Sequence, residues 1–138
     1  MRVLLKRVGK PLEEVQSDKQ YRTDCAAQFL GESRQERVYW SDTLAMVCDE
    51  IGLYKQLPLN FLMEIKNPFH PIQRIVGDVV FIRTKPLDLL SDPWDAEVED
   101  IRDEDIAVIT DLLSEEKQNI LAFCYAARIG ARGANNGI

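Results

Sequence analysis

The sequence predicts an α+β fold in which a small, mostly antiparallel sheet is covered by one early helix and two C-terminal helices. Short apolar runs rich in β-branched and aromatic residues alternate with turn residues as far as about residue 84, which is typical of strands. After residue 102, apolar residues recur three and four positions apart, which is typical of amphipathic helices. A chain of 138 residues suffices for one hydrophobic core, and we expect a single globular domain over residues 1–130.

The first part of the chain predicts two extended segments followed by a helix. Residues 2–8 form the first strand, a Gly-Lys-Pro break follows at residues 9–11, and residues 12–15 form the second extended segment. Residues 18–30 favour a short helix, because apolar residues gather late in this segment and Gly31 is placed to end it.

The middle of the chain predicts a hairpin. Residues 36–40 and 43–48 are two apolar strands joined by a Ser-Asp turn, so we expect them to pair. Residues 49–52 form the next turn, in which Gly52 is expected to adopt the positive φ that such turns often need.

Beyond this hairpin the sequence predicts one helical turn and one buried strand. Asn60 is expected to cap a helical turn that runs to Ile65. A polar, proline-containing loop follows, and residues 75–84 are expected to form a single buried strand with Gly77 near its start.

The last part of the chain predicts two helices. Asp103 is a suitable N-cap for a helix over residues 104–113. Ser114 can cap a second helix, which Gly130 is expected to close. Residues 131–138 are rich in Gly and Asn, so we expect a disordered tail there.

The composition is that of a globular protein, with 46% hydrophobic and 29% charged residues. No apolar run approaches the roughly 18–20 residues that a membrane span needs, and the apolar run at the N-terminus is too short for a signal peptide. The three cysteines are widely spaced and odd in number, so they form no disulfide framework. We therefore expect a cytoplasmic protein without a membrane partner.

The net charge of −6 is concentrated in one part of the chain. From residue 86 to residue 116 there are twelve acidic residues and one basic residue, Arg102. Such a stretch repels nucleic-acid backbones, so direct nucleic-acid binding is not expected. It can instead attract a protein with a basic surface, for which Glu97, Glu99 and Asp100 are the candidate contacts. The alternative is a solvated face that only aids solubility.

Three aromatic residues in loops are further candidate contacts for a partner protein. Exposed aromatic side chains commonly anchor protein interfaces, although aromatics beneath a loop can also belong to the core. These candidates are Tyr54, Phe69 and Trp94.

The sequence contains no pattern that predicts a catalytic, metal or cofactor site. His70 is the only histidine, and no cysteine pair has the spacing of a structural zinc site. Cys48 is followed by two carboxylates, which would raise rather than lower its pKa, so it is expected to be a small buried side chain, as are Cys25 and Cys124. The acidic residues lack the spacing of a calcium loop, and there is no glycine-rich phosphate loop.

Several short segments resemble one family. They are Met-Arg-Val-Leu-Leu at residues 1–5, Gly-Lys-Pro-Leu-Glu-Glu-Val at residues 9–15, Leu-Pro-Leu-Asn at residues 57–60, Ile-Val-Gly-Asp-Val-Val-Phe-Ile at residues 75–82 and Asp-Glu-Asp-Ile at residues 103–106. Over about residues 1–113 the chain is similar to the domain of unknown function 3846, whose members occur in phages and mobile elements of Gram-positive bacteria. The resemblance implies this setting and no catalytic residues.

These observations predict a non-enzymatic accessory protein of a phage or mobile element, which binds a host protein through its acidic face and its loop aromatics. No cofactor is expected, and the oligomeric state is left open. The alternative is a domain that binds a small molecule or hydrolyses a substrate with carboxylates, which would need a pocket lined by carboxylates with perturbed pKa values.

Overall fold

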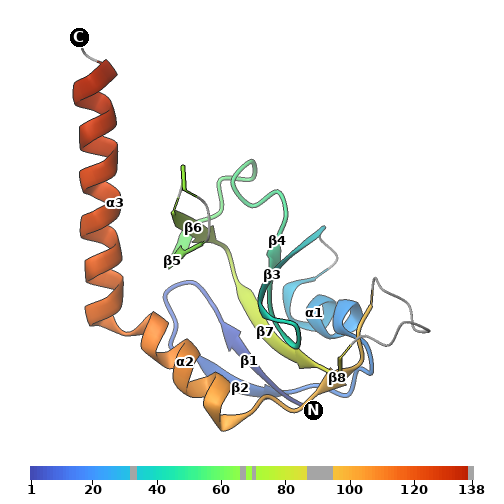
Figure 1. Ribbon diagram of the computed structural model, residues 1–138. Coiled ribbons are helices and arrows are strands. Elements are labelled where there is room, and N and C mark those ends of the chain that lie inside the picture. Colours follow the sequence, from blue (N-terminus) through green and yellow to red (C-terminus); the bar gives the residue numbers. More distant parts are fainter. Residues whose placement is uncertain (32–33, 66–67, 70, 87–94, 137–138) are drawn as a thin grey trace.

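The computed structural model describes residues 1–31, 34–65, 68–69, 71–86 and 95–136. Within them, strands and helices form a layered α+β structure (Figure 1), which confirms the predicted fold class. The elements in chain order are β1 (Arg2–Lys6), β2 (Glu13–Gln16), α1 (Arg22–Leu30), β3 (Gln35–Ser41), β4 (Leu44–Asp49), β5 (Leu59–Glu64), β6 (Ile72–Val76), β7 (Val79–Thr84), β8 (Val98–Glu99), α2 (Asp103–Leu113) and α3 (Glu115–Asn136).

The main sheet has the strand order β2-β1-β7-β4-β3, and β8 pairs with the end of β7. Every pairing is antiparallel, including the predicted hairpin of β3 with β4. β7 lies inside the sheet, and all six of its residues are buried. Because both of its faces are covered, residues 79–82 form a continuous apolar run instead of an alternating one.

Each face of the main sheet carries its own hydrophobic cluster. One face packs against α1, and the other packs against α2 and the β5–β6 ribbon. Phe81 of β7 is the centre of the second cluster, since its ring lies 5.5 Å from the Trp40 ring, edge-on, and 6.4 Å from the Phe61 ring, nearly parallel. The buried residues of the first cluster are Val3, Leu5, Cys25, Ala26, Val47, Val80, Ile82 and Val98.

β5 and β6 form a separate two-stranded antiparallel ribbon. The helical turn expected after Asn60 is therefore wrong: this segment is a strand whose partner is β6. The Asn60 side-chain amide does not cap a helix but donates to the carbonyl oxygens of Lys6 and Gly77, each at 2.8 Å. These two bonds join the ribbon to the main sheet.

The single strand expected over residues 75–84 is also wrong, because the segment divides between two sheets. β6 ends at Val76, β7 begins at Val79, and Gly77 between them adopts a φ of 73°. A Cβ atom on Gly77 would lie 2.9 Å from Cδ1 of Leu57. Both the positive φ and the close contact favour glycine at this corner.

Gly52 does not adopt the expected positive φ, so that prediction is wrong. The residue with positive φ in this turn is Gln56, at 55°. A Cβ atom on Gly52 would lie 2.9 Å from Cγ2 of Val76. Close packing against β6 is therefore the physical reason for a glycine here.

α1 begins at Arg22 instead of Asp18. The chain before it stays extended, because the carbonyl oxygen of Gln20 accepts a hydrogen bond of 2.7 Å from the backbone N–H of Val98. The helix ends where the sequence predicted, with Gly31 at a φ of 79°.

The two C-terminal helices begin close to their predicted caps. α2 has Arg102 at its N-cap, one residue before the predicted Asp103, and the Asp105 carboxylate accepts the Arg102 backbone N–H at 3.0 Å. The Ser114 hydroxyl oxygen accepts the backbone N–H of Lys117 at 3.2 Å, which confirms its predicted role as the cap of α3.

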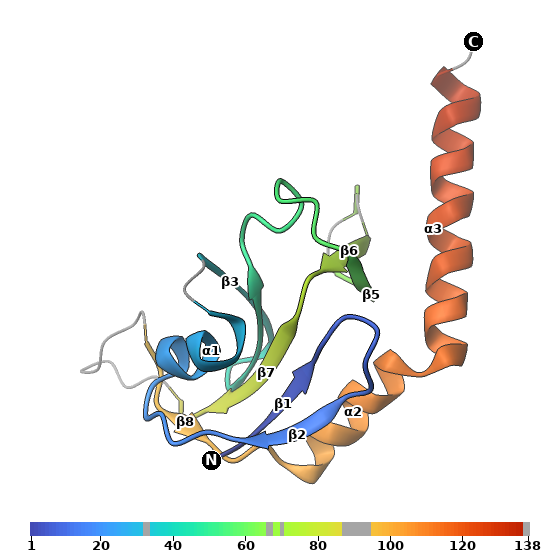
Figure 2. The same ribbon diagram turned by 180° about the vertical axis from the view of Figure 1, so that it is seen from behind.

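α3 does not end at Gly130 but continues to Asn136, so residues 131–136 of the expected tail belong to this helix. A glycine inside a helix costs about 1 kcal/mol relative to alanine, which weakens a helix without ending it. The first half of α3 packs against β5 and α2, and its second half extends past the ribbon (Figures 1 and 2). Among the described helices, none combines the length and the apolar character needed to cross a lipid bilayer.

Candidate functional site

A groove runs beside β3, the last strand of the main sheet. Its opposite wall is formed by the β5–β6 ribbon, α2 and the start of α3. Two adjoining cavities, of about 360 and 540 Å³, make up this groove. Both are lined by Val38, Tyr39, Met63 and Ile65, and we call them together the β3 groove.

Strand alternation and the second layer of structure explain the apolar lining of the β3 groove. Val38 and Trp40 are two residues apart in β3, so they lie on the same face of the sheet and pack against its core. Met63 is buried in β5 on the facing wall, and α2 contributes Val108, which is 58% exposed. The groove surface is therefore mostly apolar, with charged residues such as Glu36 and Arg74 in its lining, and it is open to solvent on one side.

The indole N–H of Trp40 is buried and has no hydrogen-bond partner among the residues that the structure describes. Trp40 lines the larger of the two cavities. A buried donor without an acceptor costs about 1–3 kcal/mol.

Several charged residues at the rim of the groove, Asp49 and Glu64 among them, form ion pairs within the chain. Lys55 lies 2.7 Å from the Asp49 carboxylate, and its hydrogen bond is the main reason that the pKa of Asp49 is below its ordinary value. On the other side of the groove, Lys117 lies 3.4 Å from Glu64. The lowered pKa of Asp49 is opposite to what a general acid requires.

Cys48 lines the smaller cavity but is not suited to nucleophilic chemistry. Burial, together with the nearby carboxylates of Glu36 and Asp49, raises the pKa of its thiol to about 12. The thiolate is the reactive form, so this cysteine stays protonated and inert at neutral pH. Cys25 is buried like Cys48, whereas Cys124 is exposed on α3, so the expectation that Cys124 is a buried side chain is wrong.

The three acidic candidates lie in and beside β8, away from the β3 groove. The Glu97 carboxylate is 3.2 Å from the Lys85 ammonium group, and Asp100 accepts the backbone N–H of Arg2 at 2.7 Å. Glu99 is the strand partner of Arg83 in the pairing of β8 with β7. Two of the three carboxylates therefore have partners within the chain.

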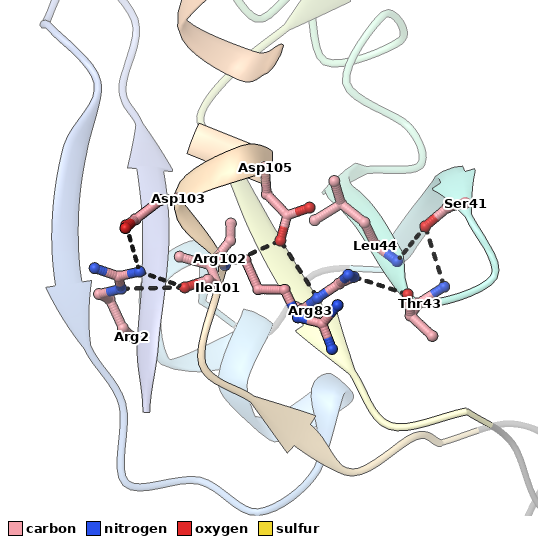
Figure 3. A network of polar contacts seen from close by, with 9 residues as sticks. All are labelled: Arg2, Ser41, Thr43, Leu44, Arg83, Ile101, Arg102, Asp103 and Asp105. Atoms are coloured by element: carbon pink, nitrogen blue, oxygen red, sulfur yellow. Dashed lines mark hydrogen bonds and ion pairs between the residues drawn. The ribbon is translucent and has the colours of Figure 1, made fainter. Parts of the chain in front are cut away.

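Two further residues of the acidic stretch, Asp103 and Asp105, contact cations from β1 and β7 (Figure 3). The Arg2 guanidinium donates to the carbonyl oxygen of Ile101 at 2.6 Å and to the Asp103 carboxylate at 3.1 Å. Arg83 lies 3.4 Å from the Asp105 carboxylate and donates to the Thr43 hydroxyl at 2.8 Å. These cations come from distant segments of the sequence, so counting charges along the chain overestimates the local negative charge.

Two of the aromatic candidates, Tyr54 and Phe69, lie outside the lining of the β3 groove. Tyr54 is 92% exposed in the turn after β4, and Phe69 is 74% exposed between β5 and β6. Trp94 and His70 lie outside the described residues. Among the residues that are described, no three His, Cys, Asp or Glu side chains are grouped so that they could hold a metal ion.

Sequence reasoning did not single out the residues that line the β3 groove. The groove depends on β5 and β6 forming a separate ribbon, and the sequence predicted a helical turn and part of another strand in their place. The available signal was in β3 itself, where Val38 and Trp40 alternate with polar residues in the outer strand of the predicted hairpin.

Comparisons with known proteins agree with the resemblance seen in the sequence. The model of the family described as domain of unknown function (DUF3846) matches residues 1–93, which include β1 to β7 and exclude β8, α2 and α3. Neither the curated proteins nor the solved structures include a match to the chain. Since the matched residues make up more than half of the chain, the protein belongs to the DUF3846 family.

Proposed function

We propose that the protein is a non-enzymatic binding module that holds an extended segment of another protein along β3. The observation that carries this proposal is the mostly apolar β3 groove beside the outer strand of the main sheet. In β-strand addition, the backbone of the bound segment pairs with the edge strand, and its alternate side chains enter pockets beside that strand. The occupant that fits is a segment with alternating apolar and polar residues.

The exposure of β3 supports this mode of binding. β3 has seven residues and pairs with β4 alone among the described strands. Proteins usually protect such edges with short strands, bulges or a covering element, because an open edge can pair with another chain. The bulge in the β3–β4 pairing lies at its end, between Tyr39 and Ser41, so most of the edge is regular.

We further propose that the protein acts in the cytoplasm as an accessory protein of a phage or mobile element, the setting implied by the family resemblance, and that its partner is a host protein. The acidic residues Glu97, Glu99 and Asp100 can add long-range attraction for a basic partner surface. Because Lys85 and Arg2 already contact two of them, this attraction is expected to be a smaller contribution than the groove.

The alternative function, small-molecule binding or hydrolysis, has one observation in its favour. Each of the two cavities falls within the range of about 300–1,000 Å³ that is usual for ligand pockets. However, the pKa of Asp49, a carboxylate in the lining, is lowered by Lys55. An open, mostly apolar groove with ion pairs at its rim suits an extended peptide better than it suits acid–base chemistry.

The proposal is tested by selecting peptides of about ten residues with alternating apolar positions from a display library. A selected peptide is then titrated into isotope-labelled protein, and backbone amide shifts are recorded by NMR spectroscopy. We expect the largest shifts at residues 35–41 and in the lining of the groove. Shifts confined to other surfaces, or no binder after selection, would contradict the proposal.

A pair of variants separates the groove from the loop aromatics. Val108→Glu places a charge in the groove at a position that is 58% exposed, so the fold should tolerate it. It should weaken peptide binding by about tenfold or more, as expected for losing a central apolar contact. Tyr54→Ser removes an exposed aromatic outside the groove lining and should leave the affinity unchanged. The reverse pattern would favour the loop aromatics as the binding surface.

A further inference from the structure

The backbone groups that β3 presents on its outer edge belong to every second residue. In an antiparallel pair, residues whose N–H and C=O groups bond the partner strand alternate with residues whose groups point away from it. The Glu50 N–H donates to the Arg34 carbonyl oxygen at 2.8 Å, so the backbone of Arg34 faces β4. When the register is continued from this pair, the backbone groups of Gln35, Arg37 and Tyr39 point away from β4, to the outer edge.

The pairing on the other edge of β4 leads to the same assignment. The Thr84 N–H donates to the Thr43 carbonyl oxygen at 2.8 Å, and the register continues this pair along β4 and β7. Every second residue from Thr43 therefore directs its backbone groups to β7, which leaves Met46 to bond with Val38, its partner in β3. The two neighbours of Val38 consequently present their backbone groups to the outer edge.

A strand that pairs antiparallel with this edge sends its side chains to two different faces. The side chains of directly opposite residues lie on the same face of an antiparallel sheet. A position opposite Val38 therefore points into the β3 groove, which Val38 lines. Positions opposite Arg37 and Tyr39 point to the other face, because both of these side chains contact residues of α1. We call this second face the α1 face of β3.

The α1 face of β3 carries two arginine side chains. Arg37 donates to the Thr23 hydroxyl, in the first turn of α1, at 2.9 Å. The Arg22 guanidinium lies 5.3 Å from the centre of the Tyr39 ring and is 1% exposed. Burial is the main reason that the pKa of Arg22 is below its ordinary value, and the positive charge of Arg37 lowers it further, whereas the Asp95 carboxylate acts in the opposite direction. The two arginines are therefore close enough to repel each other.

Arg22 is also incompletely hydrogen-bonded. Its Nε and Nη2 atoms are buried without a hydrogen-bond partner among the residues that the structure describes. Arginine stays protonated in proteins, so this position keeps its positive charge. A charge in a region of low dielectric acts over a longer distance than the same charge in water. A negative charge on the α1 face of β3 is therefore favoured even without direct contact with Arg22.

We infer that the segment bound along β3 alternates apolar side chains, which enter the β3 groove, with acidic side chains, which lie on the α1 face of β3 beside Arg37. This inference rests on the proposed function and specifies the chemistry of its partner. Opposite charges on directly opposite residues stabilise an antiparallel pair, whereas like charges destabilise it. An acidic segment is attracted by both arginines, and a basic segment is repelled by both.

The β3 strand of a second copy of this chain fits the edge less well. Its own side chains on the α1 face are Gln35, Arg37 and Tyr39, so it brings no acidic group to this face. Pairing of two such strands adds positive charge where the arginines already repel each other. The charges on this face therefore favour a different chain, with carboxylates at alternate positions, as the occupant.

The test compares three peptides of about ten residues, blocked at both ends, that share Val and Leu at alternating positions. The intervening positions are all Asp, all Asn or all Lys, so the comparison does not depend on the register. Dissociation constants are measured by NMR titration at about 0.15 M salt, where the Debye length is about 8 Å. The net charge of the protein is −6, so attraction by net charge alone would favour the Lys peptide.

We expect the Asp peptide to bind about threefold or more tightly than the Asn peptide, and the Lys peptide to bind most weakly. Equal affinities, or tightest binding by the Lys peptide, overturn this inference and leave strand addition at β3 intact. If none of the three peptides binds, strand addition fails together with this inference.

A pair of variants locates the preference for acidic residues. Arg37→Gln removes the charge on the α1 face of β3 and retains an N–H donor for Thr23, so it should lower the ratio of the Asp-peptide affinity to the Asn-peptide affinity. Arg74→Gln is the control, because Arg74 is an exposed cation of β6 that lines the β3 groove. It should leave this ratio unchanged. A ratio that falls in Arg74→Gln but not in Arg37→Gln would place the acidic side chains in the groove and overturn the inference.

The assignment of the two faces is tested by amide hydrogen exchange with the peptide that binds most tightly. The N–H groups of Gln35 and Tyr39 point to the outer edge, so a bound strand should slow their exchange. The Val38 N–H already bonds to β4, so its exchange should change less. Slower exchange at Val38 without slower exchange at Gln35 and Tyr39 would reverse the two faces and overturn the inference.

Discussion

The side-chain amide of Gln118 pairs with the backbone of Leu62 as a neighbouring strand would. Its oxygen accepts the Leu62 N–H at 2.9 Å, and its nitrogen donates to the Leu62 carbonyl oxygen at 2.9 Å. The same nitrogen donates to the carbonyl oxygen of Leu112 at the end of α2. One side chain on α3 therefore satisfies part of the outer edge of β5 and joins three elements.

Gln118→Leu should destabilise the protein by about 1–3 kcal/mol, because it leaves both polar groups of Leu62 without partners in a part-buried setting. Urea unfolding measures this change. Asn119→Leu is the matched control, since Asn119 is exposed on the same helix. Equal stabilities of the two variants would show that the Gln118 amide does not hold α3 to the ribbon.

Asp105→Ala should destabilise the protein by about 3 kcal/mol, in the range expected when a mostly buried ion pair loses one partner. The side chains of Arg83 and Asp105 are 11% and 12% exposed, so water replaces the lost carboxylate poorly. The variant also removes the acceptor of the Arg102 N–H at the start of α2. Glu104→Ala, in the same helical turn, is the control, and a similar loss of stability in both variants would contradict this explanation.

Gly77→Val should cost about 1–3 kcal/mol, because valine is strained at a φ of 73°. Gly9→Val tests strain alone, since Gly9 has a φ of 71° and a Cβ atom added there would have no other atom within 4 Å. At Gly77 the added Cβ would also meet Leu57 at 2.9 Å. Thermal unfolding should therefore show a larger loss for Gly77→Val than for Gly9→Val, and the opposite order would count against the close contact.

Stability should fall in alkaline solution partly because of Cys48. Burial is the main reason that the pKa of its thiol rises from 9.0 to about 12 in the folded protein, so the folded state holds this proton more tightly than the unfolded state does. The resulting stabilisation is fully present below pH 9 and is lost as the pH rises from 9 towards 12. The difference in unfolding free energy between wild type and Cys48→Ala, measured at several pH values, should shrink over this range. A difference independent of pH would contradict the raised pKa.

The acidic residues of β8 and its neighbourhood should affect association more than stability. Replacing Glu97, Glu99 and Asp100 by Gln, Gln and Asn removes one exposed ion pair, worth up to about 1 kcal/mol, and retains a carbonyl acceptor for the Arg2 N–H. The melting curve should therefore change little. If a basic partner surface approaches this region, the association rate should fall at low salt and become independent of the substitutions at high salt. An unchanged rate at low salt would mean that these carboxylates serve only solubility.

The parts of the fold that the sequence predicted well are those set by local pattern. The β3–β4 hairpin follows from two apolar runs around a Ser-Asp turn, and α2 follows from the helical spacing of Ile106 and Ile109. These features need only neighbouring residues. Pattern alone was therefore sufficient for the α+β class and for most strand and helix positions.

The parts that were missed depend on contacts between distant residues. The segment around Gly77 is apolar on both sides, so a continuous strand was the simplest prediction. The corner is set instead by the Asn60 amide and the Leu57 side chain, which come from an earlier segment. The β3 groove lies between the main sheet, which contains β7, and the ribbon, which contains β6. A prediction that assigns β6 and β7 to one strand has no separate ribbon and therefore no groove.

The position of β1 within the sheet has a consequence for folding during synthesis. β1 and β2 can pair early, but the other edge of β1 is occupied by β7, whose residues are 79–84. At roughly 5–20 residues per second, several seconds separate the emergence of these strands from the ribosome. During that interval the apolar residues Val3, Leu4 and Leu5 stay exposed on an open edge. Pairings over such long sequence separations also slow folding. The newly made N-terminal hairpin is thus the part of the chain most dependent on chaperones, or on rapid completion of β7, to avoid aggregation.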